Sequence, residues 1–211
     1  GGRRIDLNGY YNIYNHFLGN KTVIAPYYGT ASTAVNVTNT SIANAMNVYG
    51  AVAIANQDYR VYQLYTNTDL EIKSMGFGAG VSYALPKNFN VVANYNYAEF
   101  KFDQAKDPNF EASFNTPKHR VKVGLNNDNV YKNLGFNLSA RYNTGYKWES
   151  TFIDGWIHAA TVFDAQLSYN IPKLKSVIKL GGTNLSRKEY RQVLGAGLIG
   201  SQYFLGLTYN P

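Results

Sequence analysis

A strict alternation of apolar and polar residues runs through the C-terminal part of the chain, in segments 161–171, 176–185 and 202–210. Successive side chains of a strand point to opposite faces, so each segment predicts a β-strand with one apolar and one polar face. Alternation alone fits both a soluble sandwich, which buries the apolar face, and a membrane barrel, which turns it to lipid. The apolar sets are Phe163, Ala165, Leu167, Tyr169 and Ile171, then Ile178 and Leu180, then Tyr203, Leu205, Leu207 and Tyr209.

The same pattern occurs further upstream and brings the prediction to about eight strands. The segment 58–85 is predicted to be either one long strand or a strand with a break near residues 66–69. Three glycines of that segment, Gly76, Gly78 and Gly80, share a face and predict room for a closely packed group. The upstream segments are 3–17, 58–85, 89–102, 117–126 and 134–146.

The connections between these strands alternate between short and long. Short turns are predicted at Pro86, near Asp128 and at Pro172, whereas long connections follow Phe17, Phe102, Tyr146 and Tyr190. Membrane barrels have short periplasmic turns and long outer loops, and a soluble sandwich has little reason for such one-sidedness. The stretches 18–57 and 147–160 are therefore predicted to be outer loops, the first of them without a strong periodic signal.

Composition narrows the function classes. The chain has 211 residues and no cysteine, which excludes disulfides and cysteine-based metal sites. No apolar run approaches the ~18 residues of a transmembrane helix, but the strands are long enough for a barrel and the 19 tyrosines suit membrane interfaces. The net charge of +7 is scattered among strands, which argues against nucleic-acid binding.

Candidate chemistry is sparse. The G-x-G-x-x-G match at residues 195–200 precedes a strand rather than a helix, so it predicts a glycine-rich loop and no dinucleotide site. His16, His119 and His158 lie far apart without neighbouring acids, which gives no metal-ligand spacing. We therefore assign no catalytic, cofactor-binding or metal residue and predict that the protein is not an enzyme. A hydrolytic site assembled in three dimensions from Ser, His and Asp residues distant in the sequence is an alternative that the motifs do not exclude.

Four aromatic residues fall in the predicted loops: Tyr27, Tyr28, Trp148 and Trp156. Such rings bind sugars or apolar ligands, and they also anchor barrels at the membrane interface. The abundance of aromatic girdles in membrane barrels favours the second role.

Five successive C-terminal motifs resemble the end of the barrel in TonB-dependent outer-membrane receptors, and most closely those of Bacteroidetes-type bacteria. Distinctive features are Asp164 within its strand, the pair Asn184-Leu185 followed by Tyr190, and Phe204 in the terminal segment that resembles an assembly signal. Pro211 departs from the aromatic residue that usually closes that signal. The motifs are FNTPKHRVKVGL, GFNLSARYNTGYKW, TVFDAQLSYNIPKL, IKLGGTNLSRKEYRQV and YFLGLTYNP.

The resemblance implies an all-β, antiparallel transmembrane barrel of 22 strands, of which residues 1–211 supply about the last eight. An N-terminal plug and the earlier strands would lie outside this sequence. The implied function is uptake of a scarce nutrient such as an iron chelate, cobalamin, glycan or peptide across the bacterial outer membrane, energised through TonB. Implied partners are outer-membrane lipid, the TonB complex, the barrel-assembly machinery, the nutrient and a surface lipoprotein, without nucleic acid or cofactor.

Two rival interpretations remain at this stage. The chain is alternatively a complete eight-stranded outer-membrane barrel that acts as an adhesin, structural protein or enzyme. It is otherwise a soluble, ligand-binding β-protein that buries its apolar faces.

Overall fold

The computed structural model describes residues 2–26, 59–107, 110–150 and 153–210. The chain forms two compact units. The first comprises Gly1–Tyr14, Ile72–Phe102 and Phe114–Pro211, and the second comprises Asn15–Glu71 and Asp103–Ser113. The described part of the chain contains strands and two short 3₁₀ helices, and no helix in it is long and apolar enough to span a membrane.

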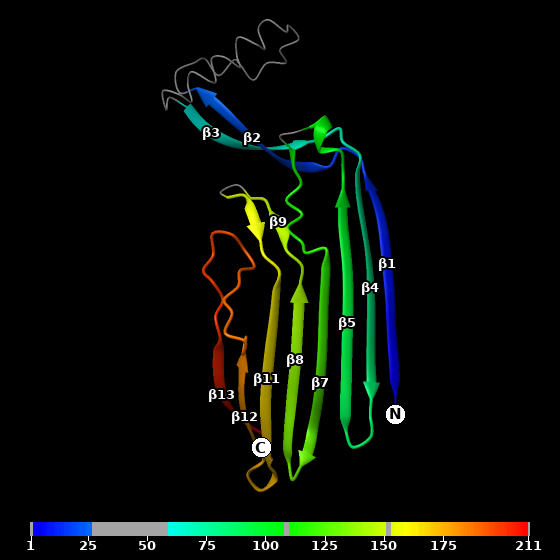
Figure 1. Ribbon diagram of the computed structural model, residues 1–211, viewed down its shortest axis with the longest axis vertical. Helices are drawn as coiled ribbons and strands as arrows, with labels where there is room; N and C mark the ends of the chain where they lie inside the picture. The colour runs from blue at the N-terminus through cyan, green and yellow to red at the C-terminus, as the bar shows by residue number, and fades with distance from the viewer. Residues whose placement is uncertain (1, 27–58, 108–109, 151–152, 211) are drawn as a thin grey trace, which may run out of the picture. The chain divides into compact units, whose positions relative to one another are not determined.

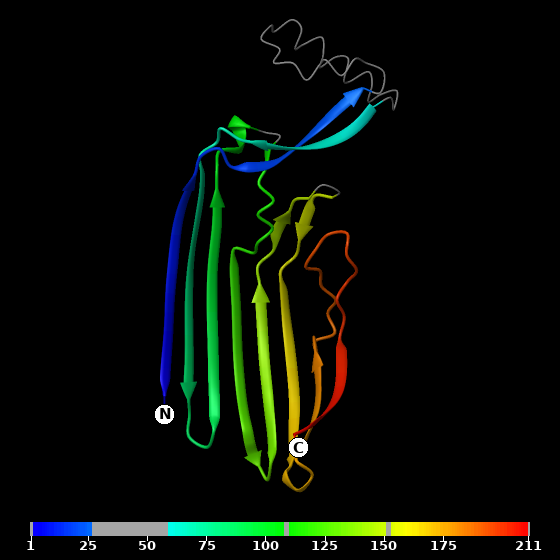
Figure 2. The ribbon, with the colours of Figure 1, turned by 180° about the vertical axis from the view of Figure 1, so that it is seen from behind.

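The first unit is built on one antiparallel sheet of eight strands (Figure 1), as the alternation predicted. Figure 2 shows the same order from behind. Each strand pairs with the strands before and after it in this order, and β1 and β13 lie at the two edges. The order is β1 (Arg3–Tyr14), β4 (Ile72–Ala84), β5 (Phe89–Lys101), β7 (His119–Tyr131), β8 (Leu134–Asn143), β11 (Ala160–Ile171), β12 (Ser176–Thr183) and β13 (Gln202–Tyr209).

Short turns connect the strands at one end of this sheet, which we call the turn end; the opposite end is the loop end. Lys87 and Asn88 both have positive φ, of 60° and 63°, as the tight turns of hairpins require. Lys132 and Asn133 form the second turn with the same signs. The third is the 3₁₀ helix η3 (Pro172–Leu174), closed by Lys175.

The second turn lies further along the chain than predicted. The turn predicted near Asp128 is displaced to Lys132 and Asn133, because β7 continues to Tyr131 through an irregularity in register that begins at Asn127. The buried Asn127 side chain donates to the backbone oxygen of Lys87 at 2.8 Å and accepts from the Asn129 amide at 2.9 Å. The polar run that suggested a turn is therefore a bulge held by an asparagine.

The second unit contains a three-stranded sheet of β3 (Tyr59–Asn67), β2 (Leu18–Pro26) and β6 (Phe110–Glu111). The break predicted near residues 66–69 is confirmed, since β3 ends at Asn67 and the next strand begins at Ile72. The prediction of a loop over 18–57 is wrong for 18–26, which form β2, and its remainder from 27 lies outside the described residues.

The side chains of this unit pack around Phe110. Its ring lies edge-on to Phe17, with centroids 6.5 Å apart, and it covers Gly19, where a Cβ would collide with the ring. A strand with a glycine under an aromatic ring and no consistent apolar face gives no alternating signal, which explains why the pattern missed β2.

Candidate functional site

The register of the eight-stranded sheet brings the apolar sets of all strands onto one face, which we call the apolar face. Residues directly opposite one another in antiparallel strands share a face. One row crosses six strands: Ile5, Val81, Ala93, Val123, Ala140 and Phe163. Another row passes through Phe136, Leu167, Leu180 and Leu205. The face assignments made from alternation are therefore confirmed strand by strand.

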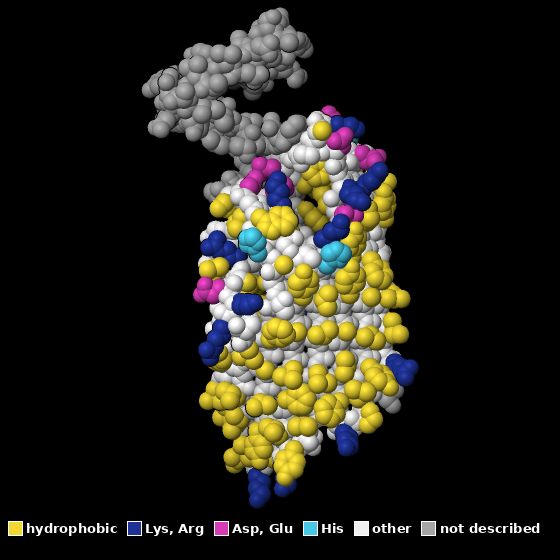
Figure 3. All heavy atoms as spheres, in the orientation of Figure 1, with side chains coloured by type: hydrophobic (Ala, Val, Ile, Leu, Met, Phe, Trp, Pro, Cys, Tyr) yellow, Lys and Arg dark blue, Asp and Glu magenta, His cyan; other side chains and the backbone are white. Residues whose placement is uncertain are grey.

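This apolar face is exposed. Figure 3 shows hydrophobic side chains spread over most of one side of the sheet. Leu205 is 76% exposed, and Leu7, Leu167 and Leu207 are exposed as well. Soluble monomers seldom expose a contiguous apolar patch of this extent, so the face marks contact with lipid or with another apolar surface.

The length of the apolar runs suits a bilayer. Phe89 to Tyr97 in β5 and Leu134 to Tyr142 in β8 each cover about nine residues, the length of a tilted transmembrane strand. Charged residues follow the run of β5 at the loop end. Lysines stand in or beside the short turns at the other end: Lys87, Lys132, Lys173 and Lys175.

The opposite side, the polar face, is shaped by glycines that neighbouring strands cover. A Cβ on Gly76 would collide with the ring of Tyr10, and one on Gly78 would lie 2.6 Å from Oδ1 of Asn8. Gly80 is approached in the same way by Asn94, at 2.9 Å. The room predicted above these glycines is therefore filled from within the sheet, because a large side chain packs across the empty position of its partner.

Basic residues gather on the polar face near the loop end. Three of them form a cluster that we call the basic triad: Arg120 and Lys122 of β7 and Arg141 of β8. Lys122 lies directly opposite Arg141. Like charges in opposite positions destabilise a sheet. Asp164 compensates Arg141, with Nη2 to Oδ2 at 3.1 Å, but in the described part of the chain Arg120 and Lys122 have no ion-pair partner. The triad therefore carries excess positive charge that suits an acidic partner.

Asp164 also holds the connection between β12 and β13, residues 184–201, in place. The Asn184 amide donates to Asp164 Oδ1 at 3.1 Å, and Asn184, 1% exposed, has a φ of 52° that ends the strand. Its Nδ2 donates to the Lys188 oxygen at 2.9 Å and its Oδ1 accepts from Ser186 at 3.0 Å. Ser201 donates to the Asn184 oxygen at 2.6 Å, which joins both ends of the connection. The Asp164 and Asn184 motifs of the sequence thus form one structural network.

The segment 147–160, predicted as a loop, contains a short hairpin of β9 (Tyr146–Trp148) and β10 (Gly155–Ile157). The Tyr146 hydroxyl donates to the Gln192 oxygen at 2.8 Å and so ties the hairpin to connection 184–201. Burial raises the pKa of Tyr146, which keeps this hydroxyl protonated and able to donate.

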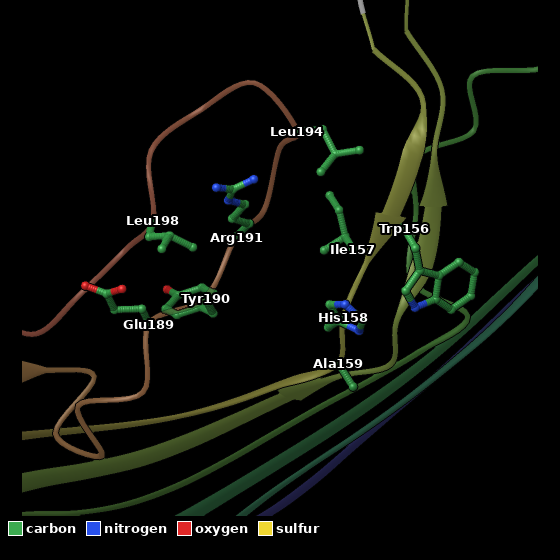
Figure 4. Close-up of a pocket in the computed structure, with 9 residues that line it drawn as sticks. All are labelled: Trp156, Ile157, His158, Ala159, Glu189, Tyr190, Arg191, Leu194 and Leu198. Atoms are coloured by element: carbon green, nitrogen blue, oxygen red, sulfur yellow. The ribbon is translucent and has the colours of Figure 1, made fainter.

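Between the hairpin and connection 184–201 lies a cavity of about 320 Å³ (Figure 4), close to the lower limit for small-molecule sites. Figure 4 shows Ile157 and His158 on the hairpin side, Tyr190 and Arg191 on the connection, and Leu194 between the two sides. The lining mixes apolar, aromatic and charged side chains, a composition suited to a ligand of mixed polarity.

The three histidines occupy separate settings. His16 lies 3.6 Å from a carboxylate oxygen of Asp69, and His119 Nδ1 is 2.8 Å from the Tyr95 hydroxyl. His158 lines the cavity. No group of three or more potential metal ligands occurs among the residues that the structure describes.

The structure also locates the G-x-G-x-x-G match at residues 195–200 and two of the four aromatic candidates, Trp148 and Trp156. Residues 195–200 form an irregular segment before β13, and only Gly195 has a positive φ, of 84°, so the prediction of a loop is confirmed. Trp148 and Trp156 lie in the β9–β10 hairpin. Tyr27 and Tyr28 lie outside the described residues.

Comparison with known proteins relates the fold to solved transport proteins. No protein-family model and no curated protein matches the sequence. In fold, the chain is similar to part of the copper transporter OprC, with 15% identity and a TM-score of 0.60, over 97% of this chain and 28% of that one. It is similar to part of the ferric-catecholate import receptor Fiu from E. coli K12, with 16% identity and a TM-score of 0.53, over 68% and 22% of the two chains.

A third similar structure is the ferric citrate transporter FecA, with 18% identity and a TM-score of 0.52, over 65% of this chain and 24% of that one. The chain thus spans about a quarter of the length of each of these proteins. At these identities the likeness concerns the fold alone. The three proteins are described as receptors or transporters, not as enzymes.

Proposed function

We propose that this chain supplies about eight C-terminal strands to the 22-stranded barrel of a TonB-dependent receptor in the bacterial outer membrane. The observation that carries the proposal is the register that places the apolar residues of eight strands on one exposed face. In a barrel this face contacts lipid and the polar face lines the lumen. The receptor takes up a scarce nutrient and is not an enzyme.

The proposal includes a part of the protein beyond this sequence. The strands β1 and β13 leave unpaired edges, which cost several kcal/mol per backbone group in hydrocarbon. Earlier barrel strands would pair with these edges, and an N-terminal plug would contact the TonB complex. The motifs of residues 114–211 support the Bacteroidetes-type branch of the family, and the terminal segment supports assembly by the barrel-assembly machinery. A surface lipoprotein partner is proposed on the resemblance to that branch alone.

The polar face and the loop end are the proposed route of the nutrient. The basic triad faces the lumen in this arrangement, and the cavity between the hairpin and connection 184–201 opens among the outer loops. An iron chelate, cobalamin, a glycan or a peptide would first meet these outer loops. The excess positive charge of the triad favours a ligand that carries carboxylate or other acidic groups.

The two rival interpretations are less well supported. A soluble protein would bury the apolar face, which is exposed on seven of the eight strands and half-buried on β5. A complete eight-stranded barrel would pair β1 with β13, whereas both are edges of the sheet. Refolding the 211 residues alone in detergent separates the cases, because the receptor segment should aggregate or stay unfolded. A heat-resistant, ligand-binding monomer would favour the small barrel.

Topology can be tested by cysteine labelling, since the chain has no native cysteine. In intact cells that produce the whole receptor, Gly197→Cys, where a Cβ meets nothing within 4 Å, should react with a membrane-impermeant maleimide. Lys87→Cys, in a turn at the other end of the sheet, is the matched control and should react only after the outer membrane is permeabilised. Equal labelling of both positions, or the reverse order, would contradict the proposed topology.

Nutrient uptake needs its own experiment. Removal of residues 194–198 should weaken ligand capture and leave the barrel inserted, since shortening a surface loop changes closure entropy little. Uptake would be compared across labelled iron chelates, cobalamin, glycans and peptides, with membrane insertion measured on the same cells. Full uptake of every class after the deletion would exclude connection 184–201 from ligand capture.

A further inference from the structure

The apolar face ends in charged residues at the loop end of β5 and β7. In β5 the residues after Tyr97 that share its face are Glu99 and Lys101, because every second residue of a strand points to the same side. Lys118 directly precedes β7 and reaches the same place. Figure 3 shows charged side chains and two histidines above the hydrophobic area on this face.

Glu99 is the centre of this cluster. Its carboxylate accepts from the Tyr97 hydroxyl at 2.7 Å and from Lys118 Nζ at 2.5 Å, and Lys101 Nζ lies 3.1 Å away. The Glu99 side chain is 15% exposed, whereas Lys101 and Lys118 are 58% and 50% exposed. Two ammonium groups share one carboxylate, so the cluster has excess positive charge, and each ammonium has N–H groups for a further acceptor.

Aromatic rings form the floor of the cluster and hold it in place. The ammonium of Lys118 lies 5.6 Å from the centre of the Tyr97 ring, within the range of a cation–π contact. His119 packs against Tyr97 with ring centres 5.3 Å apart and contacts the Tyr95 hydroxyl through Nδ1. Tyrosines are typical of the headgroup level of a membrane, so the lysines stand where lipid phosphates lie.

A pair of exposed salt bridges would be worth little as a stabilising device. On a face that contacts lipid, however, these lysines are positioned beside anionic headgroups, which attract each nearby basic residue. We propose that Lys101 and Lys118 bind the phosphate of an anionic lipid in the outer leaflet, with Glu99 and Tyr97 fixing the two ammonium groups. This site rests on the proposed function, since it requires the apolar face to contact lipid.

The site can be tested on the whole receptor, purified from outer membranes and placed in nanodiscs. Retention of phosphorylated lipid A against phosphatidylcholine would be measured by native mass spectrometry. The double variant Lys101→Gln/Lys118→Gln should lose selective retention by about tenfold or more. The control Arg4→Gln/Lys179→Gln also removes two charges, but from the polar face outside the basic triad, and should retain the lipid as the wild type does.

A further variant separates lipid binding from a purely structural ion pair. Glu99→Gln keeps both ammonium groups and removes the carboxylate that competes for them, so it should retain the phosphorylated lipid at least as well as the wild type. A structural ion pair predicts instead that Glu99→Gln and the lysine variant behave alike. Unchanged retention in the lysine variant would overturn the proposal.

Two other outcomes identify different causes. Inorganic phosphate that binds the delipidated receptor at Lys101 and Lys118 as tightly as lipid A does would assign the site to soluble anions and overturn the lipid source. Release of the receptor from membranes by alkaline carbonate would show that the proposed function itself fails. Membrane retention without selective lipid binding would overturn the phosphate site alone.

Discussion

The two faces of the eight-stranded sheet share one backbone but are stabilised differently. On the apolar face, rows such as Ile5 to Phe163 continue from strand to strand, and no single contact decides the arrangement. On the polar face, contacts between particular residues stabilise the sheet. Tyr10 covers Gly76 and Phe204 covers Gly181. Asp164 joins Arg141 to Asn184.

The difference has a physical origin. The apolar contacts with lipid that we propose for one face are non-directional and depend on apolar area, so many side chains of suitable size would fit there. A wet, polar face must satisfy hydrogen bonds and balance charges at particular atoms. Substitutions on the apolar face should therefore matter by their polarity, and those on the polar face by their particular partners.

The largest effect is expected for a charge on the apolar face. In the proposed barrel, Leu167→Arg, between Phe136 and Leu180, should destabilise the inserted state by ~2–4 kcal/mol, because arginine near the bilayer midplane must reach water or headgroups. Gln166→Arg, one residue away on the polar face, is the control and should cost under ~1 kcal/mol. Guanidinium unfolding of the receptor in lipid vesicles measures both. Equal losses would contradict the sidedness.

Packing on the polar face gives the next effect. Gly76→Ala places a Cβ against the Tyr10 ring and should cost ~1–3 kcal/mol by overpacking. Gly206→Ala is the matched control, because a Cβ there meets nothing within 4 Å. Adding Tyr10→Ala to Gly76→Ala should recover part of the loss, which a double-mutant cycle would measure as a coupling energy. Additive costs would show that the ring does not depend on the glycine.

The sequence predicted the fold of the sheet well because alternation is a direct consequence of strand geometry. The segments 134–146 and 161–171, for example, contain β8 and β11, and both strands have the predicted apolar and polar faces. Prediction failed where the sequence has no alternating pattern, as in β2, whose Gly19 packs under Phe110. It also failed at Asn127, where local composition indicated a turn and a buried hydrogen bond produces a bulge instead.

The candidate sites were less accessible to sequence reasoning. The motifs drew attention to Asp164 and Asn184, but their mutual contact depends on strand pairing across 20 residues. The cluster at Glu99 had a usable signal, because Glu99 and Lys101 continue the register of Tyr97 with charge in place of apolar groups. The part played by Lys118 comes from the neighbouring strand, and no local pattern shows it.

A smaller effect is expected for the polar network at the loop end. Asp164→Asn removes the anion beside Arg141 and weakens the acceptor for the Asn184 amide, and should cost ~1–2 kcal/mol. Connection 184–201 should then be cut faster by trypsin, which has sites within it at Arg187, Lys188 and Arg191. Asp6→Asn is the control, since its pair with Arg4 is exposed. Unchanged cleavage in Asp164→Asn would show that Asp164 does not hold the connection.

The smallest effect concerns a single hydrogen bond of the hairpin. Tyr146→Phe removes the donor to the Gln192 oxygen and should cost ~0.5–1.5 kcal/mol locally. Both tryptophans of the chain lie in or beside this hairpin, so intrinsic fluorescence reports its detachment. The variant should resemble the detached state already at neutral pH, with the eight-stranded sheet intact by circular dichroism.

The same bond predicts a pH dependence. Burial raises the pKa of Tyr146 above the usual value of about 10, so the folded hairpin favours the neutral phenol. The stabilisation is fully present below about pH 10 and is lost as the pH rises through the raised pKa. Wild-type tryptophan fluorescence should therefore change in the alkaline range, whereas Tyr146→Phe should lack this transition. A fluorescence transition of equal size in both proteins would show that other tyrosines cause it, and would contradict a role for Tyr146 in holding the hairpin.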